Sequence, residues 1–561
     1  MQPNYEVEMR LNVRTPMRDG IELSSDIYLP SAEGKFPTVL MRTPYDNNGD
    51  AMIEKGRRLA NNGYACVIQD VRGRWDSDGT HYALFNHAED GFDTQEWIGQ
   101  QEWSDGNIGM AGGSYGGWVQ WQSAPLRSEY LKCLAPRVMC GDLYTGLIHP
   151  GGAFQLNVAL TWGMRTNGRT AQSIEYHNWT EAFRSTPVVD MDHLAGRELR
   201  FWRDWVSHTE YDDYWDSVNI ETKWDQFAVP ALVMGGWYDL YSQNAFINFN
   251  GLKLNGRTEE ARQSRLIVGP WPHALSASTK TGDIDFGVNS MVDLESLELR
   301  WFDYWMRGAD NGVADEAPLR LFIMGVNVWR DEHEWPLART DWQKWNFHSF
   351  GNANTLGGDG RLSLSEPGDE TPDTFVFDPE HPAQTVGGNN CCSPHIVAWG
   401  PYDQRGVEMR ADVLCYTSNP LESDIEVTGP IKVVLYAATD GSDTDWTAKL
   451  VDVSDTGYAQ NLCDGIIRAR YRDSFTEPSL LDANKVYRYE IDLAVTGNVF
   501  KKGHQIRVEV SSSNFPRFDR NLNTGHAPGM DAEIEIADQT VYHDTSRPSH
   551  LTLPVIPRES G

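Results

Sequence analysis

The sequence predicts two architectures in one chain of 561 residues: an α/β domain that carries an inserted helical cap, followed by an all-β domain of the jelly-roll type. Three observations predict this fold class. Short apolar runs alternate with polar stretches of helical length in the first part of the chain. A Trp-rich polar stretch without such runs interrupts that alternation, and β-branched segments with a period of two residues follow it.

The α/β domain is expected in two parts, residues 1–142 and 224–335. Its strands are short apolar runs bounded by turn residues, which is typical of strands that are buried on both faces of a parallel sheet. They lie at residues 36–41, 64–69, 108–111, 131–135, 230–235 and 265–268.

Helices are expected between these strands. Residues 86–102 have helical length, and apolar residues at helical spacing run from Leu294 to Trp305. Arg307 and Gly308 then provide the basic last turn and the glycine stop that are typical of a helix end. Strands that alternate with helices indicate an α/β domain.

Residues 143–223 interrupt this alternation and are interpreted as a cap. They are rich in Trp, His, Arg and Asp and contain no obvious buried strand. Two stretches within them, residues 171–186 and 193–208, have helical character. Because an insertion between two strands of an α/β domain commonly roofs an active site, the cap is expected to cover the site of this domain.

Residues 336–561 are predicted to form a jelly-roll β-sandwich. A connector rich in Gly, Asn and Ser is followed by segments that alternate β-branched and polar residues and lack helical periodicity. Representative segments are residues 431–439, 445–453, 506–513 and 532–538.

The charge balance narrows the range of partners. The chain has 48 Lys and Arg against 80 Asp and Glu, a formal net charge of −32. Nucleic acid and anionic membrane surfaces would repel such a protein, so neither is expected as a partner. No apolar run approaches the roughly 18 residues needed to cross a bilayer. The first residues also lack the basic and apolar regions of a signal peptide.

The cysteines point to a reducing, cytoplasmic location. Seven cysteines, an odd number spread over a long chain, predict no disulfide framework. Cys391 and Cys392 are adjacent and have no second Cys/His pair at zinc spacing, so no metal site is expected. No cofactor is expected either.

A nucleophile motif follows one of the predicted strands. Residues 112–116 read Gly-Gly-Ser-Tyr-Gly, between an apolar strand end and an aromatic helix, which matches the G-x-S-x-G pattern in its strand–turn–helix setting. Glycines at both ends let the backbone turn tightly, so that Ser114 can expose its hydroxyl. The alternative is a glycine-rich turn whose serine only caps the helix. The setting favours the nucleophile.

A serine hydroxyl needs a base to remove its proton and an acid to orient that base. In α/β hydrolases the chain order is serine, acid, histidine, with the later members just beyond C-terminal strands. Asp239 follows one predicted strand and His273 follows the next, at the edge where open α/β sheets build their sites. His273 is preferred over the cap histidines His149, His177 and His193.

Two tyrosines are candidates for binding an oxyanion. Tyr115 follows the serine, so its backbone N–H lies at a helix N-terminus, where developing negative charge is stabilised. Tyr45 lies near the end of an early strand, and its phenol is a candidate second donor. On spacing alone, Tyr45 could equally be a packed aromatic residue.

The chain resembles the bacterial cocaine esterase family, a group that also includes α-amino-acid ester hydrolases, glutaryl-cephalosporin acylases and X-Pro dipeptidyl peptidases. The resemblance covers essentially the whole chain. It is carried by segments such as PMRDGIELSSDIYLP, DGNIGMAGGSYGG, GWYD, VGPWPH, QTVGGNNCC and SSSNFPRFDRNLNTG. It implies an α/β-hydrolase core with an inserted helical cap and a C-terminal jelly roll, with the same boundaries as those read from composition.

The resemblance also implies a serine-esterase mechanism. Ser114 matches the family's nucleophile, Asp239 its acid and His273 its base. Tyr45 matches the tyrosine whose hydroxyl donates to the oxyanion, and Tyr115 matches the residue that donates a backbone N–H.

A substrate pocket and an assembly are further implications of the resemblance. Trp162 in the cap, Tyr241 after the acid, and Cys391 and Cys392 in the jelly roll match positions that line the acyl or leaving-group pocket. Cocaine-cleaving members carry bulky apolar residues in place of the cysteine pair, so the resemblance implies ester chemistry without implying cocaine as the substrate. The pair is closer to the acylase members. A homodimer is a candidate assembly.

The sequence thus predicts a serine hydrolase that cleaves small-molecule carboxylic esters, or activated amides, through an acyl-enzyme. Three alternatives stay open. The first is X-Pro dipeptidyl-peptidase-type or acylase activity on amides, and the second is acyl transfer to an alcohol or amine. The third is a binding protein whose β domain captures a sugar or a protein, which the intact set of Ser114, Asp239 and His273 disfavours.

Overall fold

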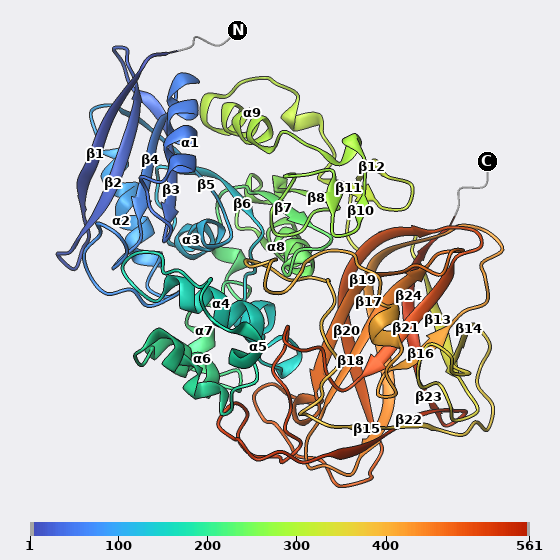
Figure 1. The fold of residues 1–561 in the computed structure, drawn as a ribbon. Helices are drawn as coiled ribbons and strands as arrows, with labels where there is room; N and C mark the ends of the chain where they lie inside the picture. Colours follow the sequence, from blue (N-terminus) through green and yellow to red (C-terminus); the bar gives the residue numbers. More distant parts are fainter. Residues whose placement is uncertain (1–4, 558–561) are drawn as a thin grey trace.

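The structure, a computed structural model, describes residues 5–557 of the chain. It contains a ten-stranded sheet in the first part of the chain and a twelve-stranded sheet in the last part. Figure 1 shows these sheets side by side, with the short helices of the cap below the first sheet and next to the second. The predicted fold class, an α/β-hydrolase core followed by an all-β domain, is confirmed.

The ten-stranded sheet is parallel in its middle and antiparallel at both edges. Its spatial order is β1-β2-β4-β3-β5-β6-β7-β8-β11-β12. Each of the six apolar runs predicted as strands overlaps one of the strands β3 to β8. The strands are β1 (Val7–Pro16), β2 (Glu22–Pro30), β3 (Phe36–Thr43), β4 (Ala65–Asp70), β5 (Ser104–Gly113), β6 (Leu131–Arg137), β7 (Leu232–Gly236), β8 (Arg265–Gly269), β11 (Leu319–Ile323) and β12 (Val328–Glu332).

Helices cover both faces of this sheet. On one face pack α1 (Asp50–Asn61) and α9 (Leu294–Arg307), whose buried side chains share one apolar cluster. On the other face pack α2 (Ala88–Gly99), α3 (Tyr115–Ser123) and α8 (Ser242–Asn255). Gly308 ends α9 with a φ of +67°, as the sequence predicted. A small hairpin of β9 (Lys280–Thr281) and β10 (Ile284–Asp285) lies beside the core.

The cap consists of short helices joined by loops. They are a single π-helical turn (Tyr144–Ile148), α4 (Leu156–Thr166), α5 (Trp179–Ala182), α6 (Arg200–Ser207) and α7 (Asp213–Asp216). The helix predicted at residues 171–186 is reduced to α5. Before α5 only Ile174 is buried, so no apolar stripe holds a longer helix against the core.

The β domain contains the twelve-stranded sheet. Its main path is β15-β22-β17-β24-β13-β14-β16-β21-β18-β19, with β20 paired to β17 and β23 paired to β22. One short helix, α10 (Arg405–Glu408), precedes β16. The strands are β13 (Asp341–His348), β14 (Arg361–Ser363), β15 (Asp373–Phe377), β16 (Leu414–Thr417), β17 (Ile425–Thr439), β18 (Asp445–Val453), β19 (Ala459–Arg468), β20 (Tyr487–Phe500), β21 (Gln505–Ser511), β22 (Ala537–Asp544), β23 (Arg547–Pro548) and β24 (His550–Ile556).

The start of one predicted strand of this domain is wrong. Residues 532–536 form a loop, and β22 begins only at Ala537. The Asp531 carboxylate accepts hydrogen bonds from the backbone N–H groups of Ala532 and Glu533, so these groups are not available to a neighbouring strand. Most of the loop's side chains are exposed, so the alternation of apolar and acidic residues does not mark a buried face.

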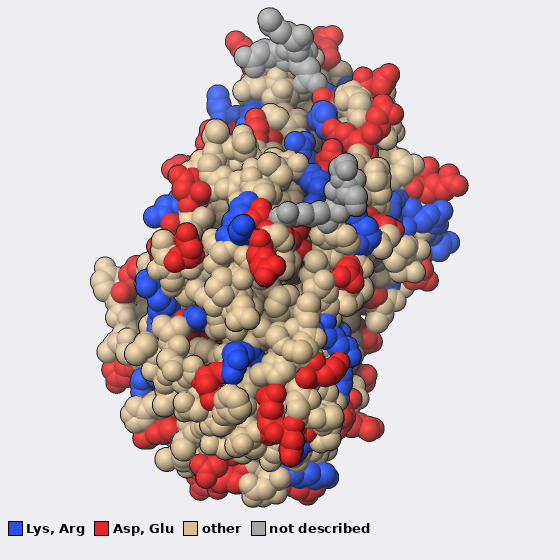
Figure 2. Space-filling model, turned by 90° about the vertical axis from the view of Figure 1, so that its right-hand side faces the viewer, with Lys and Arg blue, Asp and Glu red and all other residues tan. Residues whose placement is uncertain are grey.

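Charged side chains are spread over the surface. On the face drawn in Figure 2, acidic and basic residues are interspersed instead of gathered into one patch. This distribution agrees with a solvated surface. Within residues 5–557, the helices are too short or too polar to cross a membrane.

Candidate active site

Ser114 lies at the sharp turn between β5 and α3. Its φ of +55° and ψ of −121° are a strained combination for a residue with a side chain, and such strain is typical of an exposed nucleophile at a strand-to-helix turn. Two glycines allow the turn. Gly112 has a φ of +143°, and a Cβ there would lie 3.1 Å from the backbone of Gly116.

Backbone hydrogen bonds fix the turn on both sides. The Ser114 N–H donates to the carbonyl of Arg137 on β6 at 2.9 Å. The Ser114 carbonyl accepts from the N–H groups of Gly117 and Trp118, at 2.8 and 2.9 Å, and so begins α3. The serine is therefore held by the sheet and by the helix, which orients its hydroxyl toward the pocket described below.

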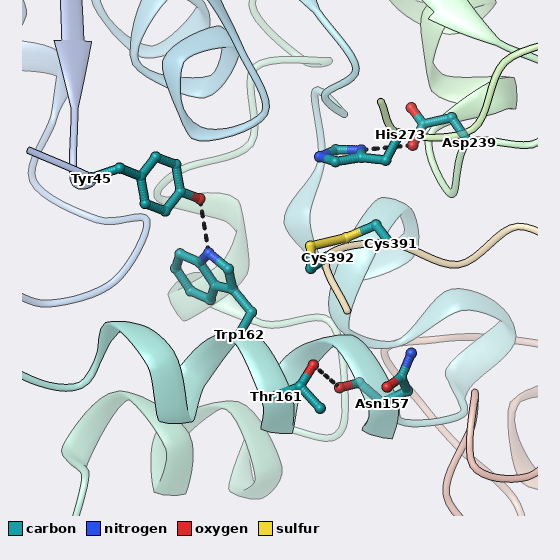
Figure 3. The surroundings of a disulfide bond; sticks show 8 residues. All are labelled: Tyr45, Asn157, Thr161, Trp162, Asp239, His273, Cys391 and Cys392. Atoms are coloured by element: carbon teal, nitrogen blue, oxygen red, sulfur yellow. Dashed lines mark hydrogen bonds and ion pairs between the residues drawn. A yellow bond between two sulfur atoms is a disulfide. The ribbon is translucent and has the colours of Figure 1, made fainter. Parts of the chain in front are cut away.

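Asp239 and His273 are in direct contact. Nδ1 of His273 lies 2.8 Å from Oδ1 of Asp239, which is fully buried in the loop after β7. An N–H donated by Nδ1 fixes the tautomer, so that Nε2 is left free to accept a proton. Figure 3 shows the outer nitrogen of the imidazole directed away from Asp239, toward the space between His273 and Tyr45.

The Ser114 hydroxyl and the Tyr45 phenol share one pocket, and the base His273 belongs to the same site. The Ser114 hydroxyl and the indole of Trp162 both act on the phenol of Tyr45 and lower its pKa, against the larger effect of burial, which raises it. Between residues 5 and 557, no hydrogen bond joins Ser114 Oγ to His273. The hydrogen bond between nucleophile and base is often long until substrate binds. The Asp–His half of the predicted relay is therefore present, and the Ser–His half stays a prediction.

Tyr45 is placed to donate its hydroxyl proton into the pocket. The indole N–H of Trp162 donates to the Tyr45 oxygen at 2.8 Å, which leaves the phenol proton available to another acceptor (Figure 3). Burial raises the pKa of Tyr45, so the phenol keeps its proton at neutral pH. An oxyanion formed at Ser114 would accept a hydrogen bond from the Tyr45 hydroxyl.

Tyr115 is held rigidly by its side chain. Its ring is almost fully buried and stacks on Trp162, with ring centroids 5.9 Å apart. Its oxygen accepts from the backbone N–H of Leu84 at 3.0 Å and lies 2.6 Å from Nε2 of His87. Burial lowers the pKa of His87 well below its ordinary value, so the imidazole is neutral and can accept the phenol proton. These contacts fix the backbone N–H that begins α3.

A pocket adjoins Ser114 between the core, the cap and the β domain, and its empty space, including the part that is open to solvent, is about 370 Å³. Most of its walls are aromatic or aliphatic, and none of the side chains is charged. It is lined by Tyr45, Leu84, Ser114, Tyr115, Met139, Leu147, Ile148, Val158, Ala159, Trp162, Trp205, Tyr241, Cys391 and Cys392. The structure thus brings all four predicted pocket residues, Trp162, Tyr241, Cys391 and Cys392, to the nucleophile.

Positive charge lies behind the oxyanion side of the site. Burial raises the pKa of the Tyr115 phenol. The positive charges of the fully buried Arg42 and Arg74 lower this pKa, but by less. Arg74 also lowers the pKa of the Tyr45 phenol. Arg42 is paired with the buried Asp90 at 3.6 Å, whereas Arg74 donates to the backbone carbonyls of Pro44 and Thr166, so the charge of Arg74 in particular favours an anion at Ser114.

Cys391 and Cys392 form a disulfide with each other. The sequence predicted no disulfide framework, and the five other cysteines are indeed free and buried, but this adjacent pair departs from that expectation. The odd count gave no signal for it, because a bridge between neighbours depends on local backbone conformation. Cys392 has a φ of +75°.

Asn389 is a site residue that sequence reasoning missed. Its side-chain amide donates to the backbone carbonyls of Trp237 and Asp239, at 2.9 and 2.8 Å, and lies 3.1 Å from Ser242 Oγ. It thereby fastens the β domain to the loop that carries the acid. The only signal in the sequence was its place in the segment QTVGGNNCC, beside the cysteine pair.

Comparison with known proteins places the chain in a family. Residues 19–275 match the model of the X-Pro dipeptidyl-peptidase (S15) family, and residues 311–552 match the X-Pro dipeptidyl-peptidase C-terminal non-catalytic domain. The sequence is 36% identical to the cocaine esterase of Rhodococcus sp. (strain MB1 Bresler) over 99% of both chains.

Solved structures of other proteins resemble this chain over almost its whole length. An α-amino acid ester hydrolase is 25% identical, with a TM-score of 0.82 over 99% of this chain and 97% of the other. An aminopeptidase from a marine sediment Thaumarchaeota archaeon is 24% identical, with a TM-score of 0.85 over the same shares, and shows the fold alone. The chain belongs to the cocaine esterase-like group of the S15 family of serine hydrolases.

Proposed function

We propose that this protein hydrolyses esters of compact apolar acids, aromatic or branched, through an acyl-enzyme at Ser114. The observation that carries this proposal is the uncharged, largely apolar pocket next to the nucleophile and to the His273–Asp239 pair. Such walls bind an apolar acyl group by removing its surface from water.

The reaction follows from the positions of the side chains. His273 takes the proton of Ser114 as the serine oxygen attacks the ester carbonyl. The Tyr45 hydroxyl and the Tyr115 N–H bind the oxyanion, and one such donor contributes roughly 3 kcal/mol to the transition state. His273 then protonates the leaving alcohol, and water, activated in the same way, releases the acid. Asp239 stabilises the imidazolium that forms at each step.

The alternative of an X-Pro dipeptidyl peptidase has less support. That activity needs an anion in the pocket to pair with the substrate's ammonium group, and none of the pocket side chains is charged. Arg74, whose guanidinium donates to backbone carbonyls, adds positive charge nearby. Burying an unpaired ammonium group costs several kcal/mol. We therefore expect kcat/KM for a Gly-Pro anilide to be at least about 100-fold lower than for an aryl benzoate.

The test is the substitution Ser114→Ala. We expect it to lower kcat for an aryl ester by about 10⁴-fold or more, because the nucleophile is lost. The melting temperature should change little, since the serine's fold contacts are made by its backbone. Ester turnover and labelling by a fluorophosphonate would be measured together with circular dichroism.

The matched control is Ser128→Ala, a serine outside the pocket. It should keep wild-type turnover and labelling. Undiminished ester hydrolysis by Ser114→Ala would exclude the proposed mechanism. Adding an alcohol or amine to the wild type and measuring the partition of products would separate hydrolysis from acyl transfer.

A further inference from the structure

The Cys391–Cys392 disulfide lies in the wall of the active site, opposite Trp162. Figure 3 shows the pair between Tyr45 and Trp162 on one side and His273 and Asp239 on the other. Cys391 is almost fully buried, whereas Cys392 is partly accessible, and both line the pocket. A soluble reductant that enters the pocket therefore meets a sulfur atom in the same pocket as the nucleophile.

The loop that carries the cysteines is held independently of the disulfide. Asn389 anchors it to the acid loop through the three contacts given above. The side-chain amide of Asn390 donates to the carbonyls of Gly387 and Ala398, each at 2.9 Å, and closes the loop on itself. Breaking the sulfur–sulfur bond would thus leave two thiols at the same place.

A third metal-binding atom already faces these sulfurs. One ring nitrogen of His273 and both Sγ atoms lie within 4.8 Å of one another. Nδ1 of His273 is engaged by Asp239, so Nε2 is the nitrogen that is free to bind a metal. A carboxylate on the second nitrogen is the usual way in which a metal-binding histidine is oriented.

We infer that reduction of Cys391–Cys392 creates a binding site for one thiophilic divalent cation, held by both sulfurs and by Nε2 of His273, and that the bound cation blocks catalysis. Thiolate and imidazole ligands suit soft ions of the zinc and cadmium type. The sequence alone predicted no such site, because its third ligand lies 118 positions before Cys391 (391 − 273) and is brought near only by the fold.

The proposed reaction has two steps, reduction of the disulfide and binding of the cation. A phosphine reductant supplies two electrons to the disulfide and takes an oxygen atom from water, while the two protons of that water form the two thiols. The cation then displaces both thiol protons and forms two metal–sulfur bonds, and the lone pair of Nε2 completes a third bond. The imidazole can no longer accept the Ser114 proton, so the blocking of catalysis rests on the proposed function, whereas cation binding does not.

The experiment uses the full-length protein with and without phosphine treatment, followed by removal of the phosphine under anaerobic conditions. Cadmium is titrated and its thiolate charge-transfer absorbance is recorded. We expect one cadmium ion per reduced chain and none for the oxidised protein. Aryl ester turnover of the reduced protein should fall by at least about 100-fold at saturation, the contribution of a general base.

Substitutions of the three proposed ligand residues test which side chains bind the cadmium ion. The double variant Cys391→Ser/Cys392→Ser should lose the charge-transfer band, whereas the matched control Cys415→Ser, a free buried cysteine of the β domain, should keep it. His273→Ala should keep the band and bind cadmium roughly 10-fold or more weakly. If the double variant does not fold, reduced wild type alkylated at its accessible thiols replaces it.

The possible outcomes are distinct. Equal cadmium binding by oxidised and reduced protein, or by the double variant, would overturn the site. Unchanged affinity in His273→Ala would remove the imidazole from it. If no form hydrolyses esters but the band appears as expected, the proposed function fails and the cation site stands.

Discussion

At the scale of the residue, Tyr45 has the most readily tested role. Its oxygen accepts the indole N–H of Trp162, which leaves its own proton for the oxyanion. We expect Tyr45→Phe to lower kcat for an aryl ester by about 10²- to 10³-fold with little change in KM, because the lost hydrogen bond is made mainly in the transition state. The exposed Tyr176→Phe in the cap is the matched control and should behave as wild type.

The same phenol predicts behaviour at alkaline pH. Because the surrounding protein partly removes the Tyr45 phenol from water and so raises its pKa, the proton stays on the phenol above the pH at which a tyrosine free in solution ionises. We therefore expect kcat/KM to stay level between about pH 8 and 10. A fall over this range in the wild type that is missing in Tyr45→Phe would show that the phenol loses its proton and would contradict this assignment.

At the scale of the element, the end of β4 supports the loop that carries Tyr45. Asp70 is fully buried there, and its Oδ1 accepts from the N–H of Asn47 at 2.8 Å. Its Oδ2 is buried without a hydrogen-bond partner. Burial raises the pKa of Asp70 from 3.8 to about 8, so the carboxyl is protonated in the folded protein at neutral pH.

This shift predicts how stability depends on pH. A folded-state pKa above the unfolded value means that the folded protein binds the extra proton, so its stability declines as pH rises from about 4 to 8. The slope due to this one group is at most about 1.4 kcal/mol per pH unit. In Asp70→Asn the amide cannot ionise, so we expect the variant to gain stability over the wild type as pH rises.

Urea unfolding at several values between pH 5 and 9 would measure this difference. Comparing the two proteins at each pH removes the contribution of Glu221 and Glu509, whose pKa values burial raises to about 7 and which titrate in both. A difference in stability that does not change with pH would contradict the assignment to Asp70.

At the scale of the whole molecule, the β domain completes the active site. Asn389 crosses from it to the acid loop and makes two backbone contacts and one side-chain contact there. We expect Asn389→Ala to lower kcat/KM by roughly 10- to 100-fold, because a small displacement of Asp239 misplaces the base. Loss of these hydrogen bonds should cost about 1–3 kcal/mol of unfolding free energy.

The matched control is Asn354→Ala. Its side chain also donates to two backbone carbonyls, those of Thr374 and Ala411, but both belong to the β domain. We expect it to lose stability without a comparable loss of activity. Steady-state kinetics and thermal unfolding of both variants would separate the two effects, and equal losses of activity would contradict the bridging role of Asn389.

The sequence by itself determined the features whose causes are local. The turn at Ser114 needs small residues at positions 112 and 116, and the sequence has glycine at both. The strands β3 to β8 are continuous apolar runs, because a parallel strand covered on both faces must be apolar throughout. The order of Ser114, Asp239 and His273 follows from strands that end at one edge of the sheet.

Only the tertiary structure decided the features that join distant segments. The amide of Asn389 reaches a carbonyl 150 positions away, and Trp162 reaches Tyr45 over 117 positions. Such contacts depend on how the cap and the β domain dock on the core, and a single hydrogen bond leaves no periodic pattern in the sequence. The chemistry of the cysteine pair is set in the same way, because only the fold brings an imidazole to the two sulfurs.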